Sequence, residues 1–461
     1  MLALVEKQVA SPETAHALPH GHDQAERLRM LEAGGLFAPE APFTLSETGI
    51  EPEVLSDLFL KLAYTAASFT TEWAVKNLCL PLPIINDLLE QLRRDKLVEI
   101  LGDAGRFGYR LAITDRGRER AAQLVEVCGY VGPAPISLEE YSAALDWQLA
   151  HLPAVNAPEV VAAIADLVLS DATVEIAGLA GSSGRSLFLY GPPGNGKTTL
   201  AHLLHGALSG QIWIPHCIGV GSAIIVVFDP ETHRRAPMDL PRELATRVDQ
   251  RWVCVERPFV IAAGELTLEA LELSYGPGRY YDAPLHVKAN GGTFLIDDLG
   301  RQRIAPQQLL NRWLFPLENR ADYLTLQNGR KVQVPFRQLL VFSTNLDPNA
   351  ALDGSFLRRM GYRLRLGNPS AAAYTQIFQR YGARCQASIP PGLIDGLLER
   401  YRLEQRPMRS CEPRDLIERA RDICSCRGIS LKLTAELMDL AWKGYFGEQE
   451  ELEAERSGRC S

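Results

Sequence analysis

Residues 191–198, with the sequence GPPGNGKT, constrain the fold of this chain more than any other segment. They fit the pattern G-x-x-x-x-G-K-[ST], in which glycines let backbone N–H groups surround phosphate oxygens. The apolar run Ser186–Tyr190 before them is typical of a buried strand, and the segment from Thr199 indicates the start of a helix. A strand, a glycine-rich loop and a helix N-terminus in this order predict a phosphate-binding loop, or P-loop.

The residue types of this loop predict how it would bind ATP and Mg²⁺. Lys197 can reach the β- and γ-phosphates, and the Thr198 hydroxyl can coordinate Mg²⁺. A glycine-rich turn with a chance lysine is the alternative, and it leaves the flanking strand and helix unexplained. The candidate nucleotide-binding residues are Gly191, Pro192, Pro193, Gly194, Asn195, Gly196, Lys197, Thr198 and Thr199.

Two further apolar runs end in polar residues and predict the rest of the site. Thr293–Asp298 indicates a strand that ends in two carboxylates. A P-loop enzyme needs a carboxylate at a strand end to hold Mg²⁺, which Asp297 can supply, and Asp298 can orient or deprotonate the attacking water. Asn345 ends another buried run from Leu339 and can hydrogen-bond the γ-phosphate or the water. The motifs together predict an ATPase.

A chain of 461 residues is too long for a single core, so we expect several domains. Strands and helices alternate around the P-loop, which predicts an α/β domain with a parallel sheet. The expected segments are a flexible N-terminal segment 1–48, a compact domain 49–128, a Pro- and Gly-rich linker 129–154, the α/β domain 155–369, a helical domain 370–446 and an acidic tail 447–461.

Bulk composition excludes several classes of protein. A net charge of -8 argues against a chain that coats nucleic acid along its length. The nine cysteines form no C-x-x-C pair, which favours reduced thiols. No apolar stretch reaches the ~18 residues of a membrane span, and the N-terminus lacks the pattern of a signal peptide. We therefore expect a cytoplasmic protein with no membrane partner.

These motifs resemble those of the AAA+ ATPases over about residues 155–445. The matching segments are Gly184–Thr198 for the P-loop, Phe294–Asp298 for the Walker B strand, Asn345 for sensor 1, Phe356–Met360 for the arginine finger and Glu412–Leu416 for sensor 2. The resemblance implies a P-loop sheet sandwiched by helices, a helical C-terminal lid and a homo-oligomeric ring, as a hexamer. It also implies that Arg358 and Arg359 act on the nucleotide of a neighbouring subunit, and that Arg414 acts from the lid. Solvated surface charges are the alternative for these three arginines.

Two departures from the family matter. Asp298 stands where the family usually has Glu, and its shorter side chain leaves the rate of hydrolysis open. The spacing between Lys197 and Asp297 is also long for the family. The extra length predicts a hairpin between Ile212–Pro215 and Ala223–Phe228, with its turn at Gly219–Gly221.

Asn290–Asp298 resembles the branch that includes MoxR-type ATPases and enhancer-binding activators. Asn328-Gly329 between two alternating runs predicts a hairpin before the sensor 1 strand, as in that branch. The activators' G-A-F-T-G-A loop is absent, and Ser274–Tyr281 stands in its place, so sigma-factor remodelling is not supported. In that stretch Tyr275, Tyr280 and Tyr281 could either grip a polypeptide or pack as core.

The N-terminal domain resembles a winged helix. Apolar residues recur at helical spacing from Ile84 to Leu92, strand-like runs follow at Leu97–Leu101 and Tyr109–Thr114, and a helix begins near Arg116. Acidic residues are interleaved with the basic residues of this domain. The basic residues that could contact phosphates are Arg93, Arg94, Lys96, Arg106, Arg110, Arg116 and Arg118. DNA contact and protein docking both remain open for this domain.

Three candidate functions follow from these predictions. The first is a ring-forming, ATP-driven remodelling or chaperone-like motor that acts on a protein client. The second is a DNA-associated ATPase or transcriptional regulator that uses the winged helix to bind DNA. The third is a nucleotide-gated assembly switch with slow turnover, which Asp298 would suit.

Overall fold

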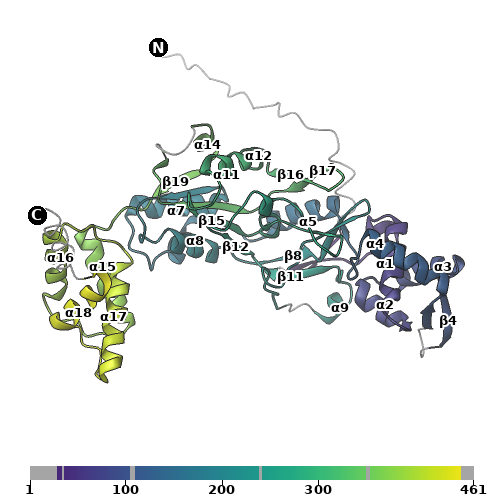
Figure 1. The fold of residues 1–461 in the computed structure, drawn as a ribbon, viewed down its shortest axis with the longest axis horizontal. Coiled ribbons are helices and arrows are strands. Elements are labelled where there is room, and N and C mark those ends of the chain that lie inside the picture. Colours follow the sequence, from purple (N-terminus) through teal and green to yellow (C-terminus); the bar gives the residue numbers. More distant parts are fainter. Residues whose placement is uncertain (1–28, 34–35, 104–108, 238–240, 349–353, 448–461) are drawn as a thin grey trace, which may run out of the picture.

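A computed structural model describes residues 29–33, 36–103, 109–237, 241–348 and 354–447. The molecule is elongated (Figure 1). A unit of four helices near the C-terminus lies at one end, an α/β layer structure lies in the middle, and the helices and small sheet of residues 52–127 lie at the other end.

The centre of the molecule is a parallel sheet of five strands. In spatial order they are β12 (Phe259–Ala262), β15 (Thr293–Leu299), β18 (Leu339–Thr344), β7 (Leu187–Tyr190) and β19 (Tyr362–Arg365). All four neighbouring pairs run parallel. Alternate residues of one strand enter different cores, since Leu187 and Leu189 pack on one face and Phe188 packs on the other. Both faces are therefore buried, which explains why these strands read as continuous apolar runs.

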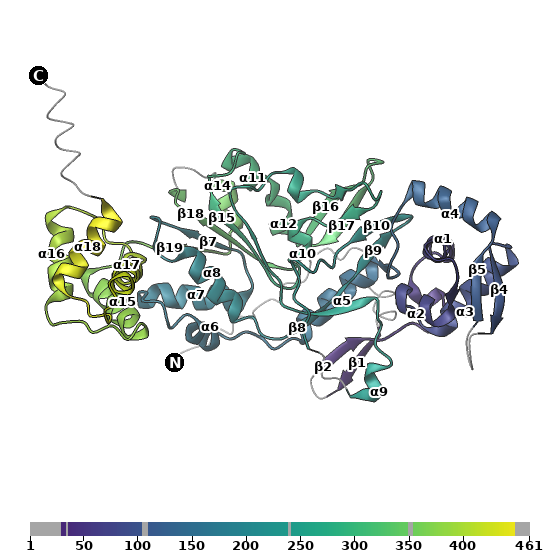
Figure 2. The same ribbon diagram turned by 60° about the horizontal axis from the view of Figure 1, so that its bottom comes forward.

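Helices cover both faces of this sheet (Figure 2). One face packs against α6 (Ala157–Ala163), α7 (Asp171–Ser183) and α8 (Lys197–Gly206). The other packs against α10 (Leu285–Lys288), α11 (Pro306–Arg312), α12 (Leu314–Asn319) and α14 (Gly354–Arg359). The predicted α/β fold, a parallel sheet sandwiched by helices, is confirmed.

The segment between α8 and β15, which we call the insertion, contributes strands to two additional sheets. Strands β8 (Gln211–Pro215) and β11 (Trp252–Glu256) pair antiparallel. A five-stranded sheet contains β13 (Ser274–Tyr275), β14 (Tyr281–Asp282), β10 (Ala223–Val226), β9 (Cys217–Val220) and β6 (Ile136–Ser137), in that order. Helix α9 (Arg242–Ala245) and the 3-10 turn η2 (Glu269–Leu271) complete the insertion.

The predicted hairpin in this insertion is correct in its turn and wrong in one strand. Strands β9 and β10 form an antiparallel hairpin around Gly221, whose φ is 58°. Ile212–Pro215 pairs with β11 instead of with β10. The hairpin before the sensor 1 strand is confirmed: β16 (Ala321–Thr325) pairs with β17 (Lys331–Pro335) around Gly329, whose φ is 80°.

The N-terminal unit has its own core. Its elements are the 3-10 turn η1 (Ser46–Thr48), α1 (Pro52–Tyr64), β3 (Phe69–Thr70), α2 (Thr71–Leu78), α3 (Leu82–Arg94), β4 (Val98–Asp103), β5 (Tyr109–Ile113) and α4 (Asp115–Val127). Thr70 and Thr114 cap α2 and α4 by accepting from Trp73 N and Gly117 N. Apolar faces of α1 and α3 meet over the sheet β3-β5-β4, which confirms the helical spacing from Ile84 to Leu92.

Two segments have more structure than their composition indicates. Of the expected flexible segment 1–48, residues 1–28 lie outside the described residues, and β1 (Met30–Ala33) pairs with β2 (Leu36–Pro39). Trp213 Nε1 donates to Phe37 O over 2.8 Å, which fixes this hairpin to the insertion. The expected linker 129–154 contains α5 (Leu138–His151), whose Gln148 side chain makes two hydrogen bonds with the Trp213 backbone.

The C-terminal helical unit contains α15 (Ala371–Arg384), α16 (Leu393–Leu403), α17 (Glu412–Arg427) and α18 (Ala435–Phe446). Its core is aromatic, with Tyr374, Phe378, Tyr401 and Trp442 all buried. Among the helices of the described segments, none is long and apolar enough to cross a membrane.

Candidate nucleotide-binding site

The P-loop joins the carboxyl end of β7 to the N-terminus of α8. Three of its glycines have positive φ, namely Gly191 (133°), Gly194 (81°) and Gly196 (84°). A Cβ on Gly191 would lie 2.2 Å from Leu366 O, so only glycine fits there. This backbone leads directly into a helix N-terminus, which favours anions.

Lys197 is 6% exposed and sits inside the loop. Its Nζ donates to Gly191 O and Pro192 O over 3.0 Å, and to Asn345 Oδ1 over 2.8 Å. Burial lowers the pKa of Lys197, while the carboxylates of Asp298 and Asp297 oppose that shift. The lysine thus lies beside Asn345, and the sequence predicts that both residues act at the γ-phosphate.

The oxygen ligands expected for Mg²⁺ also meet. Thr198 Oγ1 donates to Asp297 Oδ2 over 2.8 Å. A hydroxyl and a carboxylate at one point are hard oxygen ligands, which Mg²⁺ prefers alongside water and phosphate oxygens. No group of three or more His, Cys, Asp or Glu side chains suited to a metal occurs in the described part of the chain. The donor set therefore fits a cation bound together with phosphate.

Asp298 has an unusual backbone conformation next to this pair. Its φ is 49°, in the left-handed region, and its N–H donates to Asp297 Oδ1 over 2.9 Å. Its carboxylate lies 3.4 Å from the Arg301 guanidinium. The buried side chain of Gln302 holds the turn by donating to Asp297 O and Ala263 O.

A cavity of about 510 Å³ lies over these residues. Its wall includes the P-loop from Pro193 to Thr199, both aspartates, Asn345 and Asp166–Leu169 before α7. The C-terminal helical unit closes another side with residues from α15 and from the start of α17, and Arg414 is among them. The structure therefore brings together the P-loop, Asp297, Asp298, Asn345 and Arg414.

Two arginines in this cavity were not predicted. Arg301 and Arg384 both line it. Arg301 follows Asp297 and Asp298 by three or four residues, a spacing that could have singled it out. Arg384 ends a helix in another unit, and nothing in the local sequence distinguishes it from a solvated arginine.

Arg358 and Arg359 lie elsewhere in the subunit. They line a separate cavity of about 330 Å³, together with residues 184–186 before β7 and Phe336, Gln338 and Leu340 around the start of β18. These segments mark the amino edge of the sheet, opposite to the P-loop. Arg359 Nε donates to Glu318 Oε1 over 2.5 Å, whereas Arg358 makes no ion pair with any described residue. Within one chain, neither arginine lines the 510 Å³ cavity over the P-loop, which we call the phosphate cavity.

The three tyrosines of 274–281 have different environments. Tyr281 is 8% exposed, and its hydroxyl accepts from Gln327 N over 3.0 Å. The Tyr280 ring meets the Tyr130 ring edge-on at 5.6 Å. Tyr275 is the exposed member and packs on Tyr281. Tyr280 and Tyr281 are therefore packing residues.

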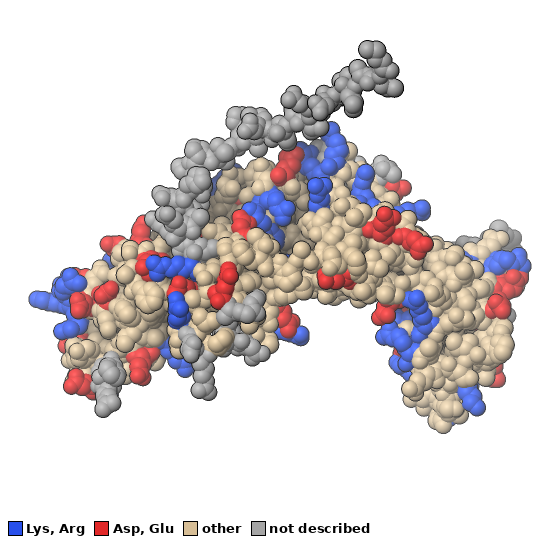
Figure 3. Space-filling model, turned by 180° about the vertical axis from the view of Figure 1, so that it is seen from behind, with Lys and Arg blue, Asp and Glu red and all other residues tan. Residues whose placement is uncertain are grey.

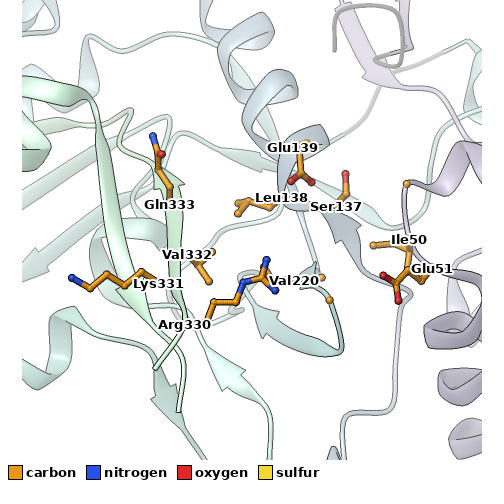
Figure 4. A pocket seen from close by; sticks show the side chains of 13 residues that line it. Ile50, Glu51, Ser137, Leu138, Glu139, Val220, Arg330, Lys331, Val332 and Gln333 are labelled. Carbon is orange, nitrogen blue, oxygen red and sulfur yellow. The ribbon is translucent and has the colours of Figure 1, made fainter. Parts of the chain in front are cut away.

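A further cavity of about 350 Å³ lies where three parts of the molecule meet (Figure 4). Arg330 and Lys331 come from the β16–β17 hairpin, Glu139 comes from the start of α5, and Glu51 precedes α1. Arg330 thus faces this space from the hairpin, opposite Glu51 and Glu139, whereas the Lys331 side chain points away from it.

The surface of the N-terminal unit carries mixed charge. On α3 the exposed residues include Asp87, Glu90, Arg93 and Arg94. Basic and acidic side chains are also interleaved on the face shown in Figure 3. Of the basic residues singled out in the sequence, Arg106 lies outside the described residues.

Comparisons with known proteins give one partial family match and several distant structures. A family model described as a domain of unknown function (DUF8689) matches residues 370–444, which span α15–α18 up to Gly444. No curated protein matches the chain. The RuvB Holliday junction branch migration motor of Thermotoga maritima is 16% identical, with a TM-score of 0.34 over 60% of this chain and 69% of that chain.

NtrX from Brucella abortus is similarly distant. Its complex with ATP is 14% identical, with a TM-score of 0.36 over 70% of this chain and 62% of that chain. Its complex with ADP is 13% identical, with a TM-score of 0.37 over 69% of this chain and 64% of that chain. The class of the present chain follows from its own geometry: it has a P-loop α/β fold, with the candidate nucleotide-binding site at the carboxyl edge of the sheet.

Proposed function

We propose that this chain is an ATP-hydrolysing AAA+ protein that assembles into a ring and acts as a remodelling motor on a protein client. One observation carries the ATPase assignment: Lys197 reaches Asn345, and Thr198 reaches Asp297, each over 2.8 Å at the same edge of the sheet. Positioning and charge neutralisation at the phosphates supply most of the catalysis in this class of reaction.

Each residue of the site has a distinct task in this proposal. Lys197 leaves its carbonyl partners in the loop and neutralises the β- and γ-phosphate oxygens. Thr198 and Asp297 hold Mg²⁺, which neutralises charge on the phosphates when it is bound. Asp298 accepts a proton from the attacking water or orients it, and Asn345 positions the same water. Arg414 adds positive charge from the C-terminal helical unit, which serves as the lid.

The ring follows from the position of Arg358. An arginine at the amino edge of the sheet cannot reach the phosphates of its own subunit, but it can reach those of a neighbour in a head-to-tail ring. The ion pair with Glu318 gives Arg359 an anchoring role, so we assign the finger to Arg358. Six subunits is the number that the family resemblance implies.

The N-terminal unit supports a protein client over DNA. Its order of elements, with helices α1, α2 and α3 followed by the β4–β5 hairpin, fits a winged helix. Phosphate binding favours a predominantly basic surface, whereas the exposed charges of α3 are two acidic residues, Asp87 and Glu90, followed by two basic residues, Arg93 and Arg94. The DNA-associated ATPase is therefore the second candidate, and salt-dependent DNA binding by the full chain would favour it.

A slow, nucleotide-gated switch is a variant of the same proposal. The Asp298–Arg301 ion pair supports it, because the guanidinium, 3.4 Å away, competes with the attacking water for the Asp298 carboxylate.

Light scattering of the full chain with and without Mg²⁺-ATP tests the ring. We expect the mass to rise from a monomer or small oligomer to a closed ring when ATP is added, since ATP adds contacts that exist only between subunits. A chain that stays monomeric with ATP and still hydrolyses it at full rate would contradict the ring and leave the ATPase assignment standing.

A further inference from the structure

Asn195 uses both polar atoms of its side chain to join the P-loop to distant segments. Its Nδ2 donates to Asn368 Oδ1 over 2.8 Å, and its Oδ1 accepts from Ser410 N over 3.0 Å. The residue is 5% exposed, so neither bond competes freely with water. Asn368 lies between β19 and the C-terminal helical unit, and Ser410 lies within that unit just before α17.

A backbone contact reinforces this junction. Cys411 N donates to Gly194 O over 2.9 Å. A Cβ on Gly194 would lie 2.8 Å from Cys411 Sγ, so the close approach requires glycine in addition to the positive φ of that residue. The P-loop therefore contacts residues 410–411 through one side chain and one backbone carbonyl.

The segment that the P-loop contacts is tied to the rest of the helical unit. Glu412 is 2% exposed, and its Oε2 accepts from Arg409 N over 2.8 Å and from the Tyr401 hydroxyl over 2.7 Å. The Tyr401 and Tyr374 hydroxyls lie 3.2 Å apart. Buried hydrogen bonds thus connect the segment of Ser410 and Cys411 to α15, α16 and α17. The C-terminal helical unit therefore moves together with this segment.

Helix α17 also carries Arg414, two residues after Glu412, and Arg414 lines the phosphate cavity. Its guanidinium bonds to the Asp415 carboxylate of the same helix, so its position at the cavity depends on how the start of α17 sits on the P-loop. We propose that Asn195 is a positioning residue that holds the C-terminal helical unit against the P-loop and thereby places Arg414 over the phosphates. The second part of this inference rests on the proposed ATPase function, whereas the first concerns the protein without nucleotide.

Amide hydrogen exchange at single-residue resolution, in the nucleotide-free full chain, tests the first part. In Asn195→Ala we expect the Ser410 and Cys411 amides both to exchange about tenfold faster or more, because the unit separates from the P-loop. The Arg409 amide bonds to Glu412 inside the unit, so it should keep its protection and report that the unit is still folded. Faster exchange at Ser410 alone would mean that the unit stays in place without Asn195, which would overturn the proposal.

Two variants sharpen this test. Asn195→Asp keeps an oxygen acceptor for Ser410 N but loses the donor to Asn368, so it should restore part of the protection at Cys411 even though its added charge weakens ATP binding. Asn319→Ala is the matched control, since Asn319 is an exposed residue of α12 whose amide bonds only to Phe315 O among the described residues. Loss of Cys411 protection in the control, or no rescue by Asn195→Asp, would count against Asn195.

ATP turnover tests the second part through a double-mutant cycle. Arg414→Ala should lower kcat in the wild-type background and have little further effect in Asn195→Ala, since the arginine is already displaced there. Additive effects of the two changes would overturn the positioning role. If the wild-type chain bound no ATP, the proposed function would be wrong. The exchange experiment would still show whether Asn195 holds the C-terminal helical unit against the P-loop.

Discussion

The hydroxyl of Thr198 donates a hydrogen bond of 2.8 Å to Oδ2 of Asp297, although 99 residues separate them in the chain. The bond joins the first residues of α8 to the end of β15, two strands away from β7 in the sheet. Because both oxygens face one point beside the P-loop, they form a ready ligand pair for Mg²⁺.

The first prediction concerns this pair. Asp297→Asn keeps the shape of the side chain and removes its charge, so turnover should fall roughly 10²-fold or more, since metal stabilisation of the transition state is lost. Chelation of Mg²⁺ should abolish wild-type turnover. Steady-state phosphate release across a Mg²⁺ titration measures both effects. If the Asp297→Asn variant kept the wild-type Mg²⁺ dependence, the metal site would have to lie elsewhere.

Asp298 carries the second prediction. Asp298→Asn should still bind ATP and hydrolyse it ~10²–10⁴-fold more slowly, because a positioned carboxylate no longer accepts the proton of the water. Asp298→Glu distinguishes a motor from a switch. Faster turnover in that variant would identify the natural aspartate as a brake, and equal or slower turnover would favour a site already suited to hydrolysis. Unchanged turnover in Asp298→Asn would assign the base to another residue.

The third prediction separates two adjacent arginines. Arg358→Ala should lower kcat by roughly 10³-fold or more, as loss of an arginine finger does. Arg359→Ala should cost much less, since its ion pair with Glu318 lies at a partly exposed site. Mixing Arg358→Ala with Lys197→Ala subunits should restore part of the activity, because some interfaces then join an intact P-loop to an intact finger. No recovery in the mixture would contradict action between subunits.

The tyrosines of the insertion give the fourth prediction. Tyr281→Ala should lower the free energy of unfolding by roughly 3 kcal/mol, since it leaves a cavity beneath the β16–β17 hairpin. Tyr281→Phe should cost about 1 kcal/mol through the lost bond to Gln327 N. Tyr275→Ala is the exposed control and should change stability by less than about 0.5 kcal/mol. Chemical denaturation measures all three, and a neutral Tyr281→Ala would contradict the core role.

The sequence predicts which residues meet at the P-loop because their positions follow from the direction of the strands in the sheet. Parallel strands end at one edge of a sheet, so apolar runs followed by Lys197, Asp297 and Asn345 have to bring those residues together. The same sequence does not predict that Ile212–Pro215 pairs with β11, because that register depends on a partner about forty residues away. Likewise, Trp213 fixes Phe37 across 176 residues, and no local pattern in the first 48 residues indicates it.

Arg384 and Asn195 lie at the candidate site, and their contacts also depend on long-range packing that no local sequence pattern indicates. The P-loop pattern allows any residue at position 195, so the contacts of Asn195 with Asn368 and Ser410 follow only from the docking of the helical unit. Arg384 reaches the cavity for the same reason.

Steady-state ATP hydrolysis by the wild-type chain and by Lys197→Ala, at saturating Mg²⁺, tests the central claim most directly. Lys288→Ala serves as the lysine control, because Lys288 pairs with Asp229 outside the phosphate cavity. The account predicts turnover by the wild type and by the control, and loss of ATP binding or turnover in Lys197→Ala. Equal affinity and turnover in wild type and Lys197→Ala would contradict it.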